Sequence, residues 1–305
     1  MTSHHFVPAE LHNSIGKHTP VLEIESGDEV TAGTVDAHGF DHRGEKIAEK
    51  PNPMTGPFFV RGAEAGDALR ITIRGIRLTR NTGWTFDTLA PNVIDPQAVS
   101  RFPERRKTEW MIDTAKGRAW LAEPPAALRN WSVAIEPMIG CFGVAPPLGQ
   151  AISTATSGAY GGNMDYRGFR AGVEVMFPVS VPGALFFLGD VHARQCDGEI
   201  VGTGIETAAE VTFTAEVIKR KAIHWPRGRN ETEIFTIGNA RPLDQALQHA
   251  TTEMLNWLME DYGLDEVAAS HVMGQCVRYD VANVFNPAYS VACRIPVDAL
   301  TGLRG

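Results

Sequence analysis

The stretch that decides the fold is "FPVSVPGALFFLGDVHARQCDGE", residues 177–199. Its first half is apolar and is interrupted by Pro178 and Pro182, which predicts two short segments of buried sheet. The second half sets ionisable side chains directly behind that sheet: Asp190, His192, Asp197 and Glu199. Because a charged group is costly to bury unless a partner or a metal compensates it, this strand end predicts either a solvated turn or a functional site.

The composition excludes several classes of partner. Of the 305 residues, 43% are hydrophobic and 21% are charged, as is usual for a globular protein. The formal charge of −8 argues against nucleic acid or an anionic membrane surface, because no basic field attracts phosphates. The sequence also lacks a run of about 18 apolar residues and the basic and apolar regions of a signal peptide. We therefore expect a cytoplasmic protein without membrane contact.

The segments on either side predict more sheet. Apolar and polar residues alternate in "VLEIESGDEVTAGTVDA" (21–37), "DALRITIRGIRL" (67–78) and "AAEVTFTAEVIKRK" (208–221), as in strands with one buried face. In the second of these, Leu69, Ile71 and Ile73 fall on one side. Residues 104–122 are typical of a hairpin.

Helices are predicted near the C-terminus. Residues 241–263 place Pro242 in a first helical turn and Gly263 at a helix end. The expected apolar stripe consists of Leu243, Leu247, Ala250, Met254 and Leu258. A second helix is predicted over 264–274, followed by two closing strands in 275–285 and 289–297.

These elements predict one β-rich α+β unit over residues 1–305, with mostly antiparallel sheets in a sandwich- or barrel-like body. We expect this body over about 15–235, with a C-terminal helical insertion over about 240–300 packed onto it. The two parts would form interlocked lobes, since no linker separates them.

Polar residues gather in four segments next to predicted strands. These segments are "TVDAHGFDH" (34–42), "YGGNMDYRG" (160–168), "GDVHARQCDGE" (189–199) and "GTGIET" (202–207). In an extended chain, residues two apart face the same way, so Asp190 and His192 can converge on one point. A divalent metal prefers such ligands, and a catalytic zinc keeps a position for water, whose proton a nearby glutamate can take.

Simpler interpretations exist for each of these signals. A single Asp-x-His pair is more often a capped turn or a surface ion pair, and a polar hairpin loop is the preferred interpretation for His38 and His42. Cys141, in "IGCFG", is either a thiol nucleophile or, as we favour, a small buried residue. Cys196 lies closer to the charged cluster and is held only as a thiol whose reactivity is limited by access. The sequence has no Gly-x-Ser-x-Gly motif and no nucleotide-binding glycine loop.

Several longer motifs resemble the acetamidase/formamidase family. They are "NPMTGPFFVRGAEAGDALRITI" (52–73), "EPMIGCFGVAP" (136–146), "YGGNMD" (160–165) and "VPGALFFLGDVHARQCDGEIVGTGIE" (181–206), in the family's order. The resemblance covers roughly residues 15–300. It implies a two-lobed β-rich fold, metal-dependent hydrolysis of short linear amides to a carboxylate and ammonia, and a homodimer or larger homo-oligomer.

The resemblance also suggests site residues. Matched by motif, the family's polar positions fall on Asp36, Asn163, Asp165, Asp190, His192, Gln195, Asp197, Glu199 and Glu206. The chain departs from the family pattern at Cys141, Tyr160 and Cys196, which leaves the choice of amide open.

From these matches we assign roles. The expected metal ligands are Asp36, Asp190 and His192, with zinc expected first and calcium or manganese as alternatives. Glu199 or Glu206 is the expected general base and later the proton donor. The expected contacts of the substrate are Asn163, backbone groups near Gly140 and Gly143, Tyr160 and Gln195. Phe58 and Phe142, with Tyr160, would give apolar walls, or would pack in the core instead.

Two rival functions remain open from the sequence. One is a metal-binding or small-molecule-binding β protein without catalysis, which would not need Glu199 or Glu206. The other is a cysteine-dependent amidase that uses Cys141 as its nucleophile.

Overall fold

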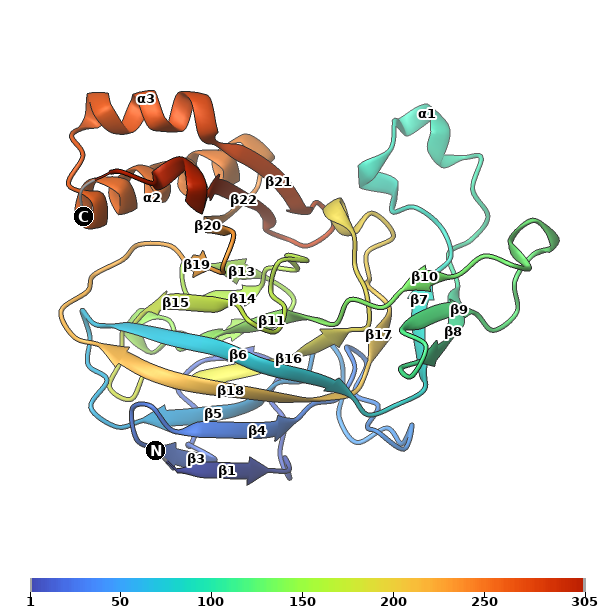
Figure 1. Cartoon of the computed structure of the whole chain (residues 1–305). Helices are drawn as coiled ribbons and strands as arrows, with labels where there is room; N and C mark the ends of the chain where they lie inside the picture. The colour runs from blue at the N-terminus through green and yellow to red at the C-terminus, as the bar shows by residue number, and fades with distance from the viewer. Residues whose placement is uncertain (1, 304–305) are drawn as a thin grey trace.

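The computed structural model of the chain describes residues 2–303, and two large sheets dominate it (Figure 1). The first sheet has nine strands, which pair antiparallel except for β1 with β4. In spatial order they are β1 (Ser3–Phe6), β4 (Glu29–Gly33), β18 (Ala209–Ile218), β6 (Ala68–Leu78), β15 (Glu174–Pro178), β19 (Arg227–Arg229), β20 (Glu233–Ala240), β22 (Tyr289–Pro296) and β21 (Arg278–Asn283).

The second sheet has eleven strands and carries the central strand β16 (Phe186–His192). The main path runs β10 (Val133–Ala134), β9 (Arg118–Leu121), β8 (Lys107–Asp113), β7 (Thr82–Phe86), β17 (Glu206–Thr207), β16, β11 (Met138–Val144), β14 (Gly161–Asn163) and β13 (Ser157–Gly158). Beside it, β5 (Thr55–Val60) pairs with β16 and β3 (Leu22–Ile24) pairs with β5. A separate pair joins β2 (Ser14–Ile15) to β12 (Ile152–Ser153).

The main hydrophobic core lies between the two sheets. Phe213 of the first sheet packs against Phe58 and Phe186 of the second, with ring centroids 5.4 and 5.1 Å apart. All three rings are buried, and burial of such large apolar surfaces is the main stabilising contribution to a fold of this kind. Phe58 is therefore a core residue rather than a wall of a substrate pocket.

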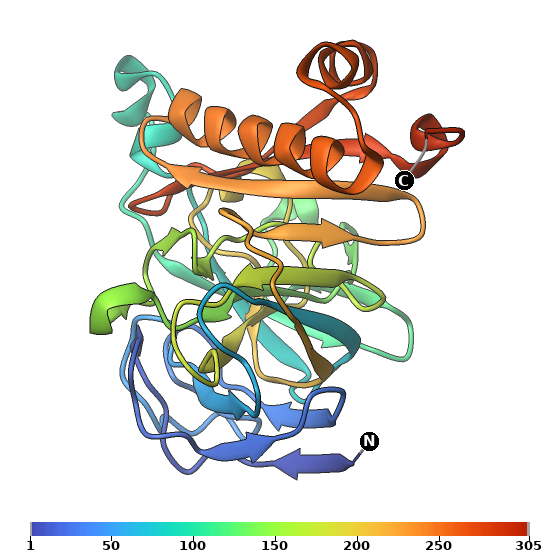
Figure 2. The same ribbon diagram turned by 90° about the vertical axis from the view of Figure 1, so that its left-hand side faces the viewer.

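The helices form a second layer near the C-terminus. Helix α2 (Leu243–Tyr262) begins after Pro242 and ends at Gly263, which has the left-handed φ of 64° that favours glycine. It lies across β20 and its neighbours (Figure 2). Helix α3 (Glu266–Cys276) follows, with Asp265 accepting a hydrogen bond from the Ala268 amide at its N-terminus.

The predicted buried face of α2 is only partly correct. Leu247 is 39% exposed, whereas Ala246, Ala250, Met254 and Trp257 are buried against the sheet. The buried face therefore includes Ala246 and Trp257 in place of the predicted Leu247. Gly238 on β20 explains the close packing, since a Cβ there would lie 2.0 Å from the Ala246 carbonyl oxygen.

The remaining helical segments are short. They are α1 (Pro96–Val99) and the 3₁₀ turns η1 (Pro91–Val93), η2 (Ala126–Leu128), η3 (Pro147–Gly149), η4 (Asp197–Glu199) and η5 (Val297–Leu300). None of the helices in residues 2–303 has both the length and the apolarity needed to cross a membrane.

The predicted fold class is confirmed. The structure is mostly antiparallel sheet with a helical region near the C-terminus, and a separate buried cluster lies beneath α2 and α3. The predicted hairpin over 104–122 is β8 with β9. The strands predicted in 21–37 also form, but β3 and β4 lie in different sheets rather than pairing with each other.

Candidate active site and metal-binding groups

The site is built around the end of β16. The pairing register places His192 of β16 directly opposite Glu206 of β17 and opposite Met138 of β11 on the other side. Asp190 precedes His192 by two positions and shares its side of the strand. Both residues are buried, as is Glu206. The short strand β17 therefore delivers a glutamate to the same point at which β16 delivers an aspartate and a histidine.

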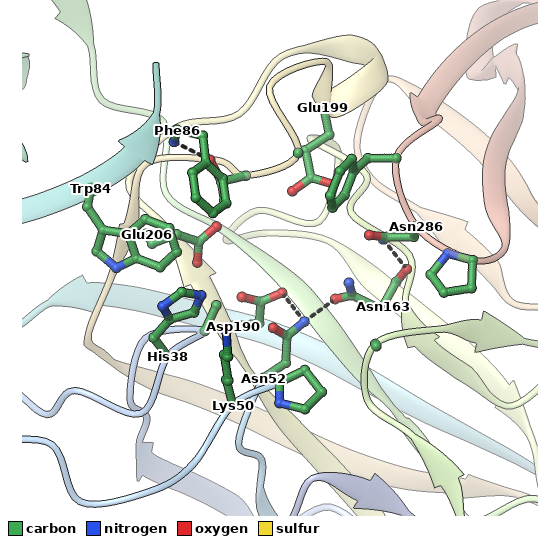
Figure 3. Close-up of a pocket in the computed structure, with 17 residues that line it drawn as sticks. His38, Lys50, Asn52, Trp84, Phe86, Asn163, Asp190, Glu199, Glu206 and Asn286 are labelled. Carbon is green, nitrogen blue, oxygen red and sulfur yellow. Dashed lines mark hydrogen bonds between the residues drawn. The ribbon is translucent and has the colours of Figure 1, made fainter. Parts of the chain in front are cut away.

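A cavity of about 190 Å³ opens above these residues. Asp190, Glu199 and Glu206 direct their carboxylates into it from three sides (Figure 3). Its apolar lining consists of Ala37, Pro51, Trp84, Phe86, Ala155, Phe285 and Pro287. The cavity is smaller than the roughly 300–1,000 Å³ of drug-sized ligand sites, so it suits a small molecule.

Three buried carboxylates share one hydrogen-bonding pattern. One oxygen of Asp190 accepts from Asn52 at 3.0 Å, one of Glu206 from the Gly204 amide at 3.1 Å, and one of Asp165 from Asn286 at 2.6 Å. The second oxygen of each carboxylate lacks a hydrogen-bond partner among residues 2–303. Each group is thus fixed through one oxygen and leaves the other free.

His192 is likewise held through one polar atom and leaves the other without a hydrogen bond. Its Nδ1 atom lies 2.8 Å from Oε1 of Gln195, while Nε2 has no aligned hydrogen bond in the described part of the chain. That nitrogen lies 3.0 Å from Oε1 of Glu206 and 3.4 Å from Oδ1 of Asp190. Buried polar atoms are nearly always satisfied in native proteins, so a cluster of unsatisfied ones needs an explanation such as a bound ion.

These residues form two groups that can hold a metal ion. The first is Asp190, His192 and Glu206, and the second is Asp165, His192 and Glu199. In each group one ligand atom per residue lies within 4.8 Å of the others. Unpartnered atoms of Asp190, His192 and Glu206 lie in the first group, and the Glu206 oxygen nearest to His192 is the one that accepts from Gly204. A set of one imidazole and carboxylates suits a divalent cation.

The crowding of charge is reflected in the pKa values. Burial, together with the charge of Asp190, raises the pKa of Asp165 to about 7. Burial likewise raises the pKa of Glu206 to about 8, and that of Glu199 well above its usual range. Burial opposes protonation of His192, but the carboxylates of Glu206 and Asp190 outweigh it and raise its pKa. The carboxylates therefore repel one another unless protons or a cation compensate them.

The backbone is strained at several of these positions. Asn52, Asp165, Asp190 and Glu199 have φ angles of 34°, 44°, 55° and 47°, in the left-handed region that non-glycine residues rarely adopt. Such strain persists only where surrounding structure imposes it, and it is concentrated at functional sites.

Two glycines make the close approach of the site residues feasible. A Cβ on Gly140 would lie 2.4 Å from Oδ1 of Asp165 and 2.9 Å from Oδ2 of Asp190. A Cβ on Gly204 would lie 2.4 Å from the ring of His192. Gly140 thus provides room for the carboxylates and, unlike its predicted role, does not itself line the cavity.

Asn163 presents its amide nitrogen to the cavity (Figure 3). Its side-chain oxygen accepts a hydrogen bond from Asn52 at 2.8 Å, which fixes the orientation of the carboxamide. Its backbone oxygen accepts from Asn286 at 3.2 Å. A donor of this kind, held rigid beside carboxylates, is suited to bind the oxygen of an amide carbonyl.

Asp36, a predicted metal ligand, lies outside both groups. Its oxygens accept hydrogen bonds from Arg80 at 2.8 Å, Trp84 at 3.1 Å, and the amides of His38 and Phe40 at 3.0 and 3.1 Å. These donors occupy both oxygens, so the carboxylate fixes the Trp84 wall of the cavity and is not free to ligate a metal.

His38 and Lys107 contact the same indole ring. The His38 ring lies 4.4 Å from that of Trp84, and Lys107 Nζ lies 3.6 Å from the indole centroid. Burial and then the charge of Lys107 lower the pKa of His38 to about 4, so its imidazole is neutral at pH 7. His38 lines the cavity, whereas His42 lies at the surface.

Other residues that were predicted to contact the substrate lie in the sheet or the core instead. Gly143 pairs with Gly161 inside the sheet, and Phe142 packs against Phe169 and Phe177. Tyr160 is buried with its hydroxyl donating to the Thr156 carbonyl. The structure places none of Gly143, Phe142 and Tyr160 in the cavity lining. Gln195 contacts His192 rather than the cavity.

The two cysteines of interest differ in exposure. Cys141 is fully buried, and burial followed by the charges of Asp190 and Asp165 raises its pKa well above the usual range. Its thiol is therefore neutral at pH 7 and a poor nucleophile. Cys196 is exposed, as is Asp197, which pairs with Arg167 at 2.6 Å.

Several site residues have no role in the sequence-based assignment. Asp165 matches a family motif but has no predicted role. Lys50, Asn52 and Asn286 line the cavity and have no predicted role either. Asn52 opens a quoted motif, so its position was visible. Nothing in the sequence indicated Asn286, because it reaches the site from the loop between β21 and β22, far along the chain.

Comparisons with known proteins agree on one family. Residues 148–284 match the model of the "Acetamidase/Formamidase family". The solved structure of an acetamidase from Yersinia enterocolitica is 30% identical, with a TM-score of 0.85, covering 98% of this chain and 93% of that one. A solved acetamidase from Bacillus halodurans is 27% identical, with a TM-score of 0.85 and coverage of 98% and 99%.

The match to curated relatives is shorter. An acetamidase from Mycolicibacterium smegmatis is 26% identical over 62% of this chain and 59% of its own length. The chain spans between 51% and 64% of the length of the curated relatives it matches. The similarity of the whole fold to the Yersinia enterocolitica protein, at the identity given above, is sufficient to assign the family. The chain belongs to the acetamidase/formamidase family.

Proposed function

We propose that the chain is an amidohydrolase that cleaves the carbon–nitrogen bond of short linear amides to a carboxylate and ammonia. The observation that carries this proposal is the set of buried, unpartnered ligand atoms of Asp190, His192 and Glu206 beside a cavity of about 190 Å³. The names of the similar proteins, acetamidase and formamidase, support the same reaction.

The three residues Asp190, His192 and Glu206 fit a divalent ion. We place zinc first because an imidazole nitrogen with carboxylates is a usual zinc set, whereas calcium prefers oxygen ligands alone. Manganese remains the alternative. When bound, such an ion supplies a Lewis acid and acidifies a water molecule. Asp36 is left out of the set because its oxygens are occupied.

Glu199 is the proposed proton carrier. It lines the cavity, its Oε2 atom has no partner among the described residues, and its pKa is raised. It would take a proton from the attacking water as the oxygen bonds to the carbonyl carbon, and then give that proton to the nitrogen as the C–N bond breaks. This transfer is needed because an unprotonated amide nitrogen is a poor leaving group. Glu206, one oxygen of which is held by Gly204, is assigned to the metal instead.

Asn163 would bind the carbonyl oxygen. Its amide nitrogen faces the cavity, and a donor held in place before reaction stabilises negative charge as it develops on that oxygen. The acyl group would then contact Trp84, Phe86 and Phe285, whose rings enclose the remaining space. A small cavity with such walls favours formamide, acetamide or propionamide over longer amides.

The rival functions predict different behaviour. A cysteine-dependent amidase needs a thiolate, which the buried position and raised pKa of Cys141 disfavour. A binding protein without catalysis needs no unpartnered Glu199 facing the cavity. Assembly into a homodimer or larger homo-oligomer and a cytoplasmic location remain expectations from the sequence.

The test is ammonia release from formamide, acetamide, propionamide, butyramide and benzamide by the purified chain. We expect turnover of the short members and little of benzamide. His192→Ala should abolish turnover and lower bound metal, while the exposed His271→Ala serves as a control with unchanged activity. A His192→Ala variant with full activity would refute the proposed site.

A further inference from the structure

We propose that Asn52 is a positioning residue that sets, through one amide nitrogen, both the substrate-binding face of Asn163 and the free oxygen of Asp190. This inference rests on the proposed function and assigns a role to the first residue of the "NPMTGP" motif (52–57). Asn52 acts through its neighbours and does not itself touch the reacting atoms.

The geometry of this amide nitrogen leaves it little freedom. Nδ2 of Asn52 lies 2.8 Å from Oδ1 of Asn163 and 3.0 Å from Oδ2 of Asp190, with the Thr154 carbonyl oxygen farther away at 3.3 Å. A carboxamide has two N–H donors, so the two shorter contacts use both. The nitrogen therefore links the two polar side chains on which the site depends (Figure 3).

The first link decides which end of Asn163 faces the cavity. Because Oδ1 of Asn163 accepts from Asn52, its nitrogen must occupy the opposite side, where it lines the cavity. Without the donor on Asn52, the Asn163 carboxamide can rotate by half a turn. Its oxygen would then face the carbonyl oxygen of a substrate, and the stabilising interaction would become repulsive.

The second link decides which oxygen of Asp190 is free. Since Oδ2 accepts from Asn52, Oδ1 remains without a partner in the described chain and lies 3.4 Å from Nε2 of His192. Hydrogen bonds of this kind to a ligating carboxylate orient it, and their loss typically lowers metal affinity about 10–100-fold.

Asn52 is itself held firmly. Its backbone amide donates to the Ala37 carbonyl at 3.0 Å, and the side chain is nine-tenths buried. Its φ of 34° is a conformation that asparagine tolerates better than most residues. A rigid support for Asn52 is consistent with a positioning role.

The experiment compares Asn52→Ala and the nearly isosteric Asn52→Asp with the wild type and with a matched control, Asn13→Ala. The control removes hydrogen bonds to the same loop but touches neither Asn163 nor Asp190. For acetamide we expect both Asn52 variants to lose about 10²–10³-fold in kcat, the scale for a lost oxyanion donor, with a smaller change in KM. Asn52→Ala should also weaken zinc binding about tenfold or more in a chelator competition.

A double-mutant cycle identifies the route of the effect. In an Asn163→Ala background, Asn52→Ala should lower kcat much less than it does in the wild type, because its partner is already gone. The loss of zinc affinity should persist there, because it passes through Asp190. Additive losses in kcat, unchanged zinc affinity, or an Asn13→Ala variant with the same defects would each overturn the proposal.

The test also separates this inference from the proposed function. If the wild type hydrolyses no amide, the proposed function fails and the role of Asn52 toward Asn163 fails with it. The zinc competition still decides the role toward Asp190, since tenfold weaker binding by Asn52→Ala supports that role and unchanged binding overturns it.

Discussion

The Nδ1 atom of His192 lies 2.8 Å from the Oε1 atom of Gln195, and this contact determines which ring nitrogen is available to a metal. Nε2 of Gln195 donates to the backbone carbonyl of Asp165, so its oxygen must be the atom that faces His192. In the neutral imidazole that a metal requires, Nδ1 is then the protonated nitrogen, and Nε2 carries the lone pair that faces Asp190 and Glu206.

The first prediction concerns Gln195. Gln195→Ala should weaken zinc binding about 10–100-fold, because the imidazole loses the partner that sets its tautomer. The exposed Gln245→Ala is the control. The measurement is a chelator competition on both variants, and equal affinities would contradict the assigned role of Gln195.

The second prediction separates the two glutamates. Glu199→Gln should keep zinc bound and lower kcat about 10²–10⁴-fold, the usual contribution of a general acid–base group. Glu206→Gln should lose zinc affinity. Metal content and kcat measured on both proteins would show the pattern, and the reverse pattern would exchange the two roles. Glu231→Gln, at an exposed position, controls for the change of residue type.

The third prediction is that metal removal destabilises the fold. Asp165, Asp190, Glu199 and Glu206 are all buried within one site, and without a cation only protons can compensate their charges. Chelation should therefore lower Tm, and added zinc should restore it, since a ligand of the native state alone stabilises that state. A Tm that is independent of zinc would argue that these carboxylates do not hold a metal.

The fourth prediction concerns pH. The pKa of Asp165 is raised to about 7 and that of Glu206 to about 8, and the pKa of His192 is also raised. Without metal these groups hold protons at neutral pH, and a bound metal must displace them. Apparent zinc affinity should thus increase between about pH 6 and pH 8, with proton release in calorimetry. Affinity that falls over this interval would contradict the ligand assignment.

The fifth prediction concerns Cys141. The raised pKa keeps its thiol protonated, so Cys141→Ala should retain most of the activity. The same variant should respond to iodoacetamide as the wild type does. If Cys141→Ala abolished turnover while leaving Tm and bound zinc unchanged, the cysteine-dependent mechanism would be favoured.

Much of the fold was predictable from local pattern. The alternation in 67–78 and 208–221 predicted β6 and β18, because a strand with one buried face repeats every two residues. Pro242 and Gly263 marked the ends of α2 correctly. The residues that α2 buries were harder to predict from the sequence, because the close packing against Gly238 of β20 determines which face of the helix meets the sheet.

The site was predictable only where it lies on one strand. Asp190 and His192 are two residues apart on β16, and their shared side follows from strand geometry. Asp36 has the residue type of a ligand, but its place depends on Arg80 and Trp84, which the local sequence does not reveal.

Contacts between distant segments account for the remaining site residues. Asn52 and Asn286 reach the cavity from loops that lie far apart in the chain. Their roles follow from hydrogen bonds to Asp190 and Asp165, and such bonds exist only after the two sheets and the β21–β22 loop have come together.

The most direct test of the central claim is ammonia release from acetamide by metal-stripped protein, titrated with zinc. The account predicts no turnover without metal, and an increase that stops at one zinc per chain, where Asp190, His192 and Glu206 are filled. Turnover that survives complete stripping, and that zinc does not change, would contradict the account.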